Sequence, residues 1–218
     1  EKKDYVGGAG IVAQHLRAAG AQVTYSTVLG DDDLKDWAVE QLEQSGITLN
    51  LIIDSTRPTI NKNAIISEGY RLLKIDTLDN RSISREIQEQ LRQHIRETPS
   101  KAVVFSDYRH GIFNKRTVPL FTEAIPEDVY RVADSQVASR WGNITEFIGF
   151  DLITPNEQEA RFSLADQDSV VGSICTSLVE KTKCQILILK LGEMGVITNR
   201  TQEGNNAHHY FSVDSLTD

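Results

Sequence analysis

The stretch FDLITPNEQEA, residues 150–160, decides how this chain is organised. Its apolar first part, residues 150–153, ends at a Thr-Pro pair, and Asn156 then stands where it can cap a helix. That helix carries two carboxylates, Glu157 and Glu159, in its first turn. A strand, a tight turn and a helix N-terminus in immediate succession predict a site at the carboxyl end of a sheet strand. Ligands bind at this place in open α/β sheets.

The predicted helix N-terminus favours charged ligands. Backbone N–H groups and the positive end of the helix dipole attract anions. Carboxylates at the same place can hold a hard cation such as Mg²⁺. Phosphate and Mg²⁺ together suggest a nucleoside triphosphate. An ordinary capped helix, whose acidic residues only balance its dipole, explains this one stretch equally well.

The composition narrows the class of protein. With 218 residues, 39% of them hydrophobic and 25% charged, the chain is typical of one globular domain, or of one domain with a small appendage. The net charge of −8 argues against nucleic acid or an anionic membrane as a general partner. No apolar run approaches membrane-spanning length. Cys175 and Cys184 match no metal spacing, which favours free thiols and a cytoplasmic protein over a disulfide.

Helical and extended patterns alternate along most of the chain. Residues 47–76 are the exception, because they read as extended throughout, with a hairpin turn at residues 67–69. From residue 82 onward, helices and strands follow each other at a spacing that predicts a mostly parallel sheet with right-handed crossovers. The runs AVVF at 102–105 and ILIL at 186–189 are apolar throughout, as central parallel strands are.

Polar or glycine-rich turns follow four of the predicted strands, at residues 106–111, 134–136, 154–156 and 190–195. In a parallel sheet these turns lie along one edge, whereas each alone is also explained as a solvated turn. Asp107 suits a metal or hydroxyl partner or a local cap, and His110 suits a phosphate contact or a plain surface position. The turn with Gly192 and Gly195 lets a ligand approach the backbone closely, or is a simple β-turn.

Taken in chain order, these pieces resemble the ribokinase-like (pfkB-type) carbohydrate kinase family over essentially the whole chain. The matching segments are VGGA (6–9), VLGDD (28–32), RPTINK (57–62), LLKID (72–76), SDY (106–108), TPNEQE (154–159) and a glycine turn (191–195). The segments at 57–76 and 106–108 look most like the kinase half of bacterial heptose-phosphate kinase/ADP-heptose synthase proteins.

The resemblance implies a fold and an activity. The fold is a three-layer α/β/α ribokinase-like domain over residues 1–218, incomplete at both ends, with a mostly parallel central sheet and a small β lid at 47–76. The activity is ATP-dependent phosphorylation of a sugar or sugar-phosphate hydroxyl, with ATP and Mg²⁺ as cofactors. The resemblance also implies a homodimer formed through the lid.

The resemblance also assigns roles to residues. Its substrate-binding positions are Gly7, Gly8, Lys62 and Asp107. Its nucleotide-binding positions are Asn156, Lys190, Gly192 and Gly195, and its metal-binding position is Glu159. The catalytic aspartate belongs to a GAGD motif, which this chain does not contain.

Four positions depart from the family pattern. Ile11, Ala64, His110 and Lys190 stand where the family usually has asparagine, arginine, lysine and threonine. These changes indicate either a different sugar or weak catalysis, although Lys190 restores a cation near the phosphates. A degenerate, non-catalytic domain that binds a sugar or nucleotide is therefore the alternative. A nucleotide-dependent oxidoreductase is disfavoured because no GxGxxG fingerprint is present.

Overall fold

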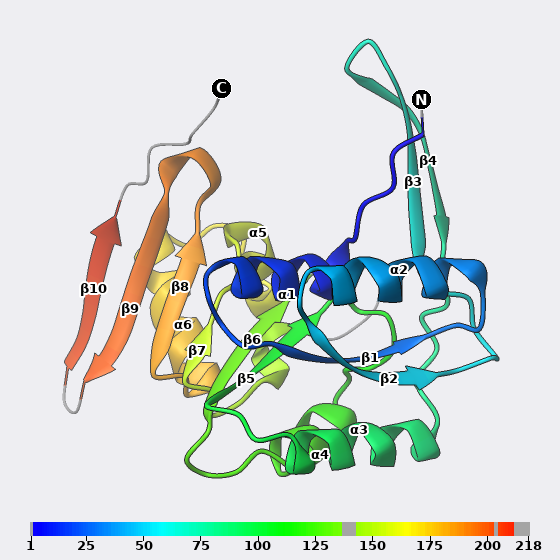
Figure 1. Ribbon diagram of the computed structural model, residues 1–218. Helices are drawn as coiled ribbons and strands as arrows, with labels where there is room; N and C mark the ends of the chain where they lie inside the picture. Colours follow the sequence, from blue (N-terminus) through cyan, green and yellow to red (C-terminus); the bar gives the residue numbers. More distant parts are fainter. Residues whose placement is uncertain (1, 137–142, 203–204, 212–218) are drawn as a thin grey trace. The chain divides into compact units, whose positions relative to one another are not determined.

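The structure is a computed structural model that describes residues 2–136, 143–202 and 205–211. It divides into two compact units, Glu1–Thr98 and Pro99–Asp218, here called the N-terminal and C-terminal units. Figure 1 shows the order of the helices and strands along the chain. Each unit builds sheets of its own: β1 with β2 and β3 with β4 in the first, and β5 to β10 in the second.

The N-terminal unit begins as a pair of helix–strand repeats. Its elements are α1 (Gly8–Ala18), β1 (Thr24–Leu29), α2 (Asp33–Gln44), β2 (Thr48–Ile53), β3 (Asn61–Ser67), β4 (Tyr70–Thr77) and α3 (Arg85–Glu97). β1 and β2 pair in parallel. A small core, in which Ala13, Leu42 and Ile47 are buried, holds α1 and α2 against this sheet.

β3 and β4 form the hairpin that the sequence predicts. The strands pair antiparallel, and the turn uses positive φ angles at Glu68 and Gly69, as tight hairpin turns do. Both strands are almost entirely exposed, and the hairpin projects as a two-stranded arm (Figure 1). One boundary needs correction. β2, which the extended pattern assigns to the 47–76 lid, pairs with β1 instead, because an extended pattern does not reveal which strand a segment will pair with.

The segments VLGDD and RPTINK meet at the base of this hairpin. Asp32 caps α2 by accepting from Lys35 N at 3.1 Å, and its second oxygen accepts from Thr59 N at 2.8 Å. Gly30 N donates to Thr59 Oγ1 at 3.0 Å. The backbones approach so closely that a Cβ at Gly30 would lie 2.5 Å from the carbonyl oxygen of Arg57. Only glycine fits there without a shift of the backbone.

We therefore expect Gly30→Ala to lower the free energy of unfolding by about 1–3 kcal/mol, because the added methyl group overpacks the junction. Urea denaturation of the intact protein measures this. Gly172→Ala in α6 (Val171–Thr182) is the matched control, since a Cβ at Gly172 meets nothing within 4 Å, and it should leave stability equal or slightly raised. Equal stability of wild type and Gly30→Ala would contradict the close approach.

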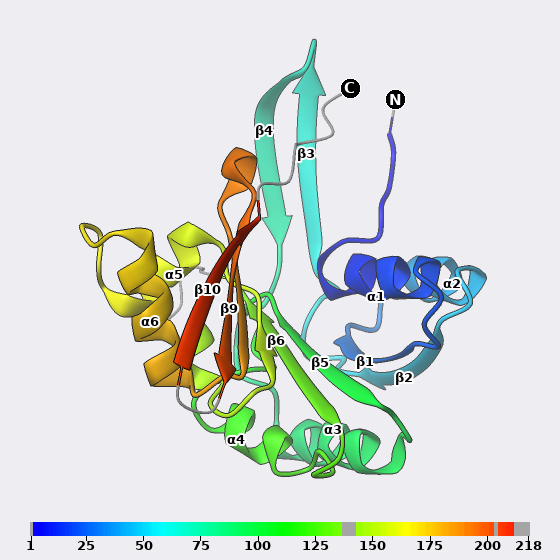
Figure 2. The ribbon, with the colours of Figure 1, turned by 90° about the vertical axis from the view of Figure 1, so that its left-hand side faces the viewer.

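The C-terminal unit is a six-stranded sheet in the order β10-β9-β8-β7-β6-β5 (Figure 2). Its elements are β5 (Ala102–Asp107), α4 (Thr117–Thr122), β6 (Tyr130–Ser135), η1 (Ile144–Glu146), β7 (Leu152–Ile153), α5 (Glu157–Leu164), α6 (Val171–Thr182), β8 (Ile186–Lys190), η2 (Gly192–Met194), β9 (Val196–Gln202) and β10 (Asn205–Phe211). β5 to β8 are parallel, as predicted, and β9 and β10 continue the sheet antiparallel.

An aromatic cluster fills the space beneath this sheet. Phe105 of β5 packs with its ring centroid 6.5 Å from Phe121 of α4 and 6.4 Å from Phe147, just after η1. Phe150 joins them at 5.5 Å from Phe105 and is fully buried. Because each of β5 to β8 pairs with the next strand in the same direction, right-handed crossovers bring their connecting helices to one face. The cluster therefore anchors the turn that leads into the 150–160 stretch.

Two expectations from composition concern the cysteines and the membrane. Cys175 and Cys184 are both free, as the sequence predicts. Both are also buried, and burial raises the pKa of Cys175 to about 11. Among the residues that the structure describes, no helix is long and apolar enough to cross a bilayer.

Candidate nucleotide site

The carboxyl ends of the four parallel strands lie along one edge of the C-terminal sheet. Asp107, the last residue of β5, pairs in register with Ser135, the last residue of β6. β7 pairs with both β6 and β8 and ends at Ile153. A further parallel bridge joins Asn156 to Lys190, the last residue of β8. The predicted edge is therefore real, and it gathers the polar turns after these strands.

Asn156 and Glu159 fix each other in a reciprocal cap at the start of α5. The Asn156 side chain accepts from Glu159 N at 2.8 Å, and Glu159 Oε2 accepts from Asn156 N at 2.7 Å. This capping box satisfies two of the backbone donors that a helix N-terminus leaves unpaired. Glu159 is buried, and burial raises its pKa, while the Asn156 N–H and the Lys190 charge oppose that rise.

A second carboxylate stands beside this cap. Asp134 Oδ1 accepts from Thr154 Oγ1 at 2.9 Å and forms an ion pair with Lys190 Nζ at 3.1 Å. The charge of Asp134 also contributes to the raised pKa of Glu159, so the two carboxylates interact electrostatically. Burial, followed by the charges of Asp134 and Glu159, raises the pKa of Tyr108 and keeps its hydroxyl a donor. The residue pattern alone does not single out Asp134, Thr154 or Tyr108; their position at successive strand ends is the signal.

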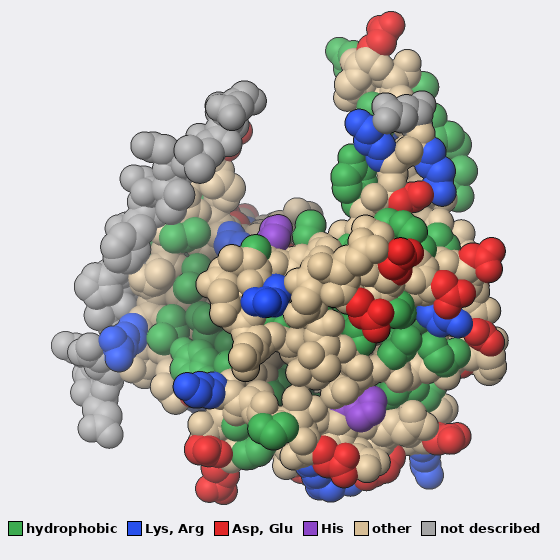
Figure 3. All heavy atoms as spheres, viewed as in Figure 1, with side chains coloured by type: hydrophobic (Ala, Val, Ile, Leu, Met, Phe, Trp, Pro, Cys, Tyr) green, Lys and Arg blue, Asp and Glu red, His purple; other side chains and the backbone are tan. Residues whose placement is uncertain are grey.

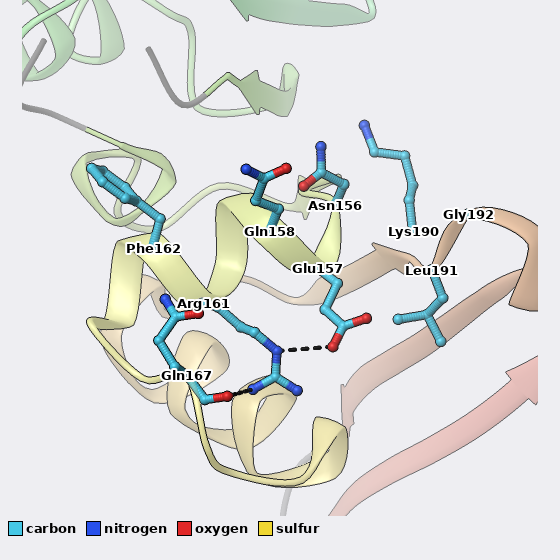
Figure 4. Close-up of a pocket in the computed structure, with 9 residues that line it drawn as sticks. All are labelled: Asn156, Glu157, Gln158, Arg161, Phe162, Gln167, Lys190, Leu191 and Gly192. Atoms are coloured by element: carbon cyan, nitrogen blue, oxygen red, sulfur yellow. Dashed lines mark hydrogen bonds and ion pairs between the residues drawn. The ribbon is translucent and has the colours of Figure 1, made fainter. Parts of the chain in front are cut away.

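A cavity of about 530 Å³ opens at this edge (Figure 4). Its lining consists of Asn156, Glu157, Gln158, Arg161, Phe162, Gln167, Lys190, Leu191 and Gly192. One wall is α5, where Arg161 Nε donates to Glu157 at 2.8 Å. The other is the turn after β8, where Gly192 has φ of 63° and Gly195 has φ of 85°. Three of the four predicted nucleotide positions, Asn156, Lys190 and Gly192, line the cavity; Gly195 supports the turn, because its carbonyl accepts from Leu191 N at 2.8 Å.

Comparison with known proteins identifies the family of this chain. The model of the pfkB family carbohydrate kinases matches residues 2–215, almost the whole chain. The chain belongs to the pfkB carbohydrate kinase family. The resemblance drawn from the motifs is thereby confirmed.

Curated pfkB relatives are similar along most of this chain. The bifunctional protein HldE of Helicobacter hepaticus is 26% identical over 208 residues, which cover 90% of this chain and 41% of that protein. The D-beta-D-heptose 7-phosphate kinase of Bordetella bronchiseptica is 27% identical over 211 residues, which cover 93% of this chain and 61% of that protein. The chain thus spans about two fifths of the length of the bifunctional relative.

Solved structures show the same fold. Ribokinase from Giardia lamblia matches with a TM-score of 0.74 at 15% identity, over 96% of this chain and 66% of its own. Phosphofructokinase-2 from Escherichia coli in complex with fructose-6-phosphate matches with a TM-score of 0.71 at 15% identity. The match covers 93% of this chain and 67% of that protein chain. The predicted α/β class, a three-layer ribokinase-like fold with a mostly parallel sheet, is confirmed.

Asp107, a predicted substrate position, is occupied by protein donors. One oxygen accepts from Arg109 N at 2.7 Å, and the other accepts from Ser135 Oγ at 2.9 Å and from the Arg109 guanidinium. The Asp107 and Arg109 side chains are only 1% and 2% exposed. Arg109 has φ of 61°, a left-handed conformation rare for such a residue. This arrangement favours the local cap over a ligand role for Asp107.

Glu146 extends the buried pair around Arg109. Its Oε2 lies 3.5 Å from Arg109 Nη2. Burial raises the pKa of Glu146, and the Arg109 charge opposes that rise. Arg109 thus links the end of β5 to η1, and it holds the turn before His110 in its left-handed shape. The sequence does not predict these contacts of Arg109 with Asp107 and Glu146. It does not predict the turn either, because arginine rarely takes a positive φ.

We expect Arg109→Met to lower the free energy of unfolding by about 3–5 kcal/mol, because it leaves the Asp107 carboxylate buried without its counter-charge. The double variant Asp107→Asn/Arg109→Met should recover part of this loss. Arg92→Met, which removes a partly exposed pair with Glu89, serves as the control and should cost less than about 1 kcal/mol. Equal losses for Arg109→Met and Arg92→Met in urea denaturation would rule out a buried ion pair.

The other predicted substrate positions belong to the N-terminal unit. Gly7 is the N-cap residue of α1, and Gly8 follows with φ of 57°. Lys62 is exposed on β3, near the base of the hairpin. Two of the family departures lie nearby in the sequence, since Ile11 and Ala64 are both exposed. These residues stay predictions for sugar binding.

The carboxylates at the C-terminal edge provide part of a Mg²⁺ site, which bound phosphates would complete. Within the described residues, no group of three or more histidine, cysteine or acidic side chains is placed to hold a metal ion. Asp134 and Glu159 provide two carboxylates, and Mg²⁺ is usually bound by one or two carboxylates together with substrate phosphates and water. The residues present therefore fit a metal that arrives with a nucleotide.

Proposed function

We propose that this chain is the ATP-binding and sugar-binding part of a carbohydrate kinase that phosphorylates a sugar or sugar-phosphate hydroxyl with Mg²⁺. The supporting observation is the edge of the C-terminal sheet, where Asn156 at the capped start of α5 and Lys190 line one cavity. Glu159 accepts a hydrogen bond from Asn156 N, and Asp134 forms an ion pair with Lys190. Membership of the pfkB family supports the reaction class. The free, buried thiols of Cys175 and Cys184 fit a cytoplasmic location, which is part of the proposal.

The residues of this edge would act mainly by positioning and by balancing charge, which is what phosphoryl transfer requires of a protein. Lys190 and the start of α5 would hold the phosphates. Gly192, with its positive φ, lets the phosphates approach the turn backbone closely. Asp134 and Glu159 would hold Mg²⁺, which neutralises charge on the phosphate oxygens.

The sugar and the proton acceptor form the second half of the proposal. Gly7, Gly8 and Lys62 would contact the sugar, and Asp107 would shape the turn at residues 106–111. The family implies that a GAGD aspartate takes the hydroxyl proton. The heptose 7-phosphate kinase named among the relatives makes a phosphorylated sugar the first substrate to try. Ile11, Ala64 and His110 indicate either a different sugar or weak catalysis, and a non-catalytic binding domain is the alternative.

We expect Glu159→Gln to weaken binding of ATP with Mg²⁺ by roughly 10-fold or more, because it removes a charged ligand. Calorimetry on the intact protein, with and without Mg²⁺, measures this. Glu180→Gln is the control, since Glu180 is an exposed carboxylate on α6 outside the cavity lining, and it should change affinity less than about twofold.

The same samples test the reaction. ADP release is measured with a panel of hexoses, pentoses, heptoses and their phosphates. Turnover with one of them supports a kinase, whereas nucleotide binding without turnover on any of them supports the non-catalytic alternative. Equal Mg²⁺ dependence in wild type and Glu159→Gln would remove Glu159 from the metal site.

The β3–β4 hairpin exposes apolar side chains on which a dimer could form. Ile65 and Leu73 face each other across β3 and β4, and Ile75 lies two residues further on the same face. Each of the three is 49% exposed. Apolar side chains lie along the projecting arm in Figure 3. Exposed strand edges with apolar faces are features that proteins cover, so we propose that a second copy of the chain covers this face.

We expect the intact protein to be a dimer at micromolar concentration, and Ile65→Asp/Leu73→Asp to be a monomer, because two charges would then be buried in the interface. Ser67→Asp adds a charge at the polar end of the arm and should stay dimeric. Light scattering distinguishes these states. A monomeric wild type across this concentration range would refute the dimer.

A further inference from the structure

Lys190 is held in place by the backbone around it. It is the last residue of β8, and its N–H donates to the carbonyl oxygen of Pro155 at 2.9 Å. A parallel bridge joins it to Asn156, the capping residue of α5. The stem of the side chain therefore starts beside the helix N-terminus, and Figure 4 shows it next to Asn156 in the cavity wall. Lys190 therefore lines the cavity beside the start of α5.

The ammonium group of Lys190 already meets one of the carboxylates proposed to hold the metal. Its Nζ lies 3.1 Å from Asp134 Oδ1, and Thr154 Oγ1 fixes the same oxygen at 2.9 Å. The Lys190 side chain is 44% exposed and that of Asp134 is 26% exposed. An ion pair so open to water is weak, and a stronger anion can displace one partner. A phosphate group arriving in the cavity is such an anion.

We propose that Lys190 supplies part of the positive charge that a divalent cation would otherwise bring to nucleotide phosphates, so that nucleotide binding here depends less on Mg²⁺. The inference deepens the proposed function and rests on it. The ammonium pairs with Asp134 in the structure, and it would turn to a phosphate oxygen when nucleotide binds. Because it shares Asp134 with the metal site, it also repels a divalent cation bound there.

Nucleotide affinity in two buffers gives the first test. The probe is ADP, titrated into the intact protein with Mg²⁺ or with EDTA. We expect EDTA to weaken ADP binding to wild type by less than about 5-fold. For Lys190→Met the loss of ADP affinity in EDTA should be a further 10- to 100-fold larger, which is about the contribution of one charge-assisted hydrogen bond. Lys190→Arg keeps the charge and should behave as wild type. Lys181→Met, a change to an exposed lysine on α6, should do so too.

Binding of Mn²⁺ without nucleotide gives an independent test by electron paramagnetic resonance. Lys190→Met should bind Mn²⁺ about tenfold more tightly than wild type, because a positive charge beside Asp134 is gone. Asp134→Asn in the same background should cancel this gain, because it removes the shared carboxylate. Lys181→Met should leave Mn²⁺ affinity unchanged.

The outcomes separate this inference from the proposed function. If EDTA lowers the ADP affinity of wild type and of Lys190→Met by the same factor, or if both bind Mn²⁺ equally, the inference is wrong. The proposed nucleotide site is not contradicted by that result. If no variant binds ADP in either buffer, both are wrong. A larger loss in EDTA for Lys190→Met together with tighter Mn²⁺ binding supports the inference.

Discussion

The parallel pairing of β5 to β8 is the constraint on which the C-terminal site depends. Parallel strands must return to the same end of the sheet before each new strand, so all four carboxyl ends emerge at one edge. Asp107, Asp134, Asn156 and Lys190 lie at or just before the end of four different strands or in the turn that follows. A shift in register of any one strand would separate them. The aromatic cluster around Phe105 helps to keep that register by packing the connecting segments against the sheet.

Solvent exposure decides which charged groups of this edge suit a ligand. The Asp107–Arg109 pair is 1% and 2% exposed, and breaking such a pair costs about 3–5 kcal/mol. The Asp134–Lys190 pair is 26% and 44% exposed, and a pair of that kind contributes about 0–1 kcal/mol. A ligand can therefore exchange partners with the second pair and not with the first. The two aspartates lie at or next to the ends of neighbouring strands, β5 and β6, yet one shapes a turn and the other is accessible to a ligand.

Local patterns were sufficient to predict part of this structure. The Asn156–Glu159 cap follows from a spacing of three residues, and the hairpin follows from Glu68-Gly69 between two extended runs. Contacts between distant residues were beyond reach. Asp134 and Lys190 are 56 positions apart, and their meeting depends on the register of three strands. The pairing of β2 with β1 could not be predicted because an extended pattern does not indicate which strand it will pair with. The role of Arg109 could not be predicted because arginine rarely takes a positive φ.

The charge at this edge explains why a lysine would reduce the need for a metal without removing it. A nucleoside triphosphate carries several negative charges into a site that already holds Asp134 and Glu159. One ammonium group cannot balance them, and its charge is shared with Asp134 as long as the two remain paired. Burial raises the pKa of Glu159, so the charged form of this carboxyl is already disfavoured there although Lys190 lies nearby. A divalent cation adds more charge than one lysine and can bridge several oxygens at once. Lys190 and Mg²⁺ would therefore work together on the same phosphates, with Asp134 as the group for which they compete.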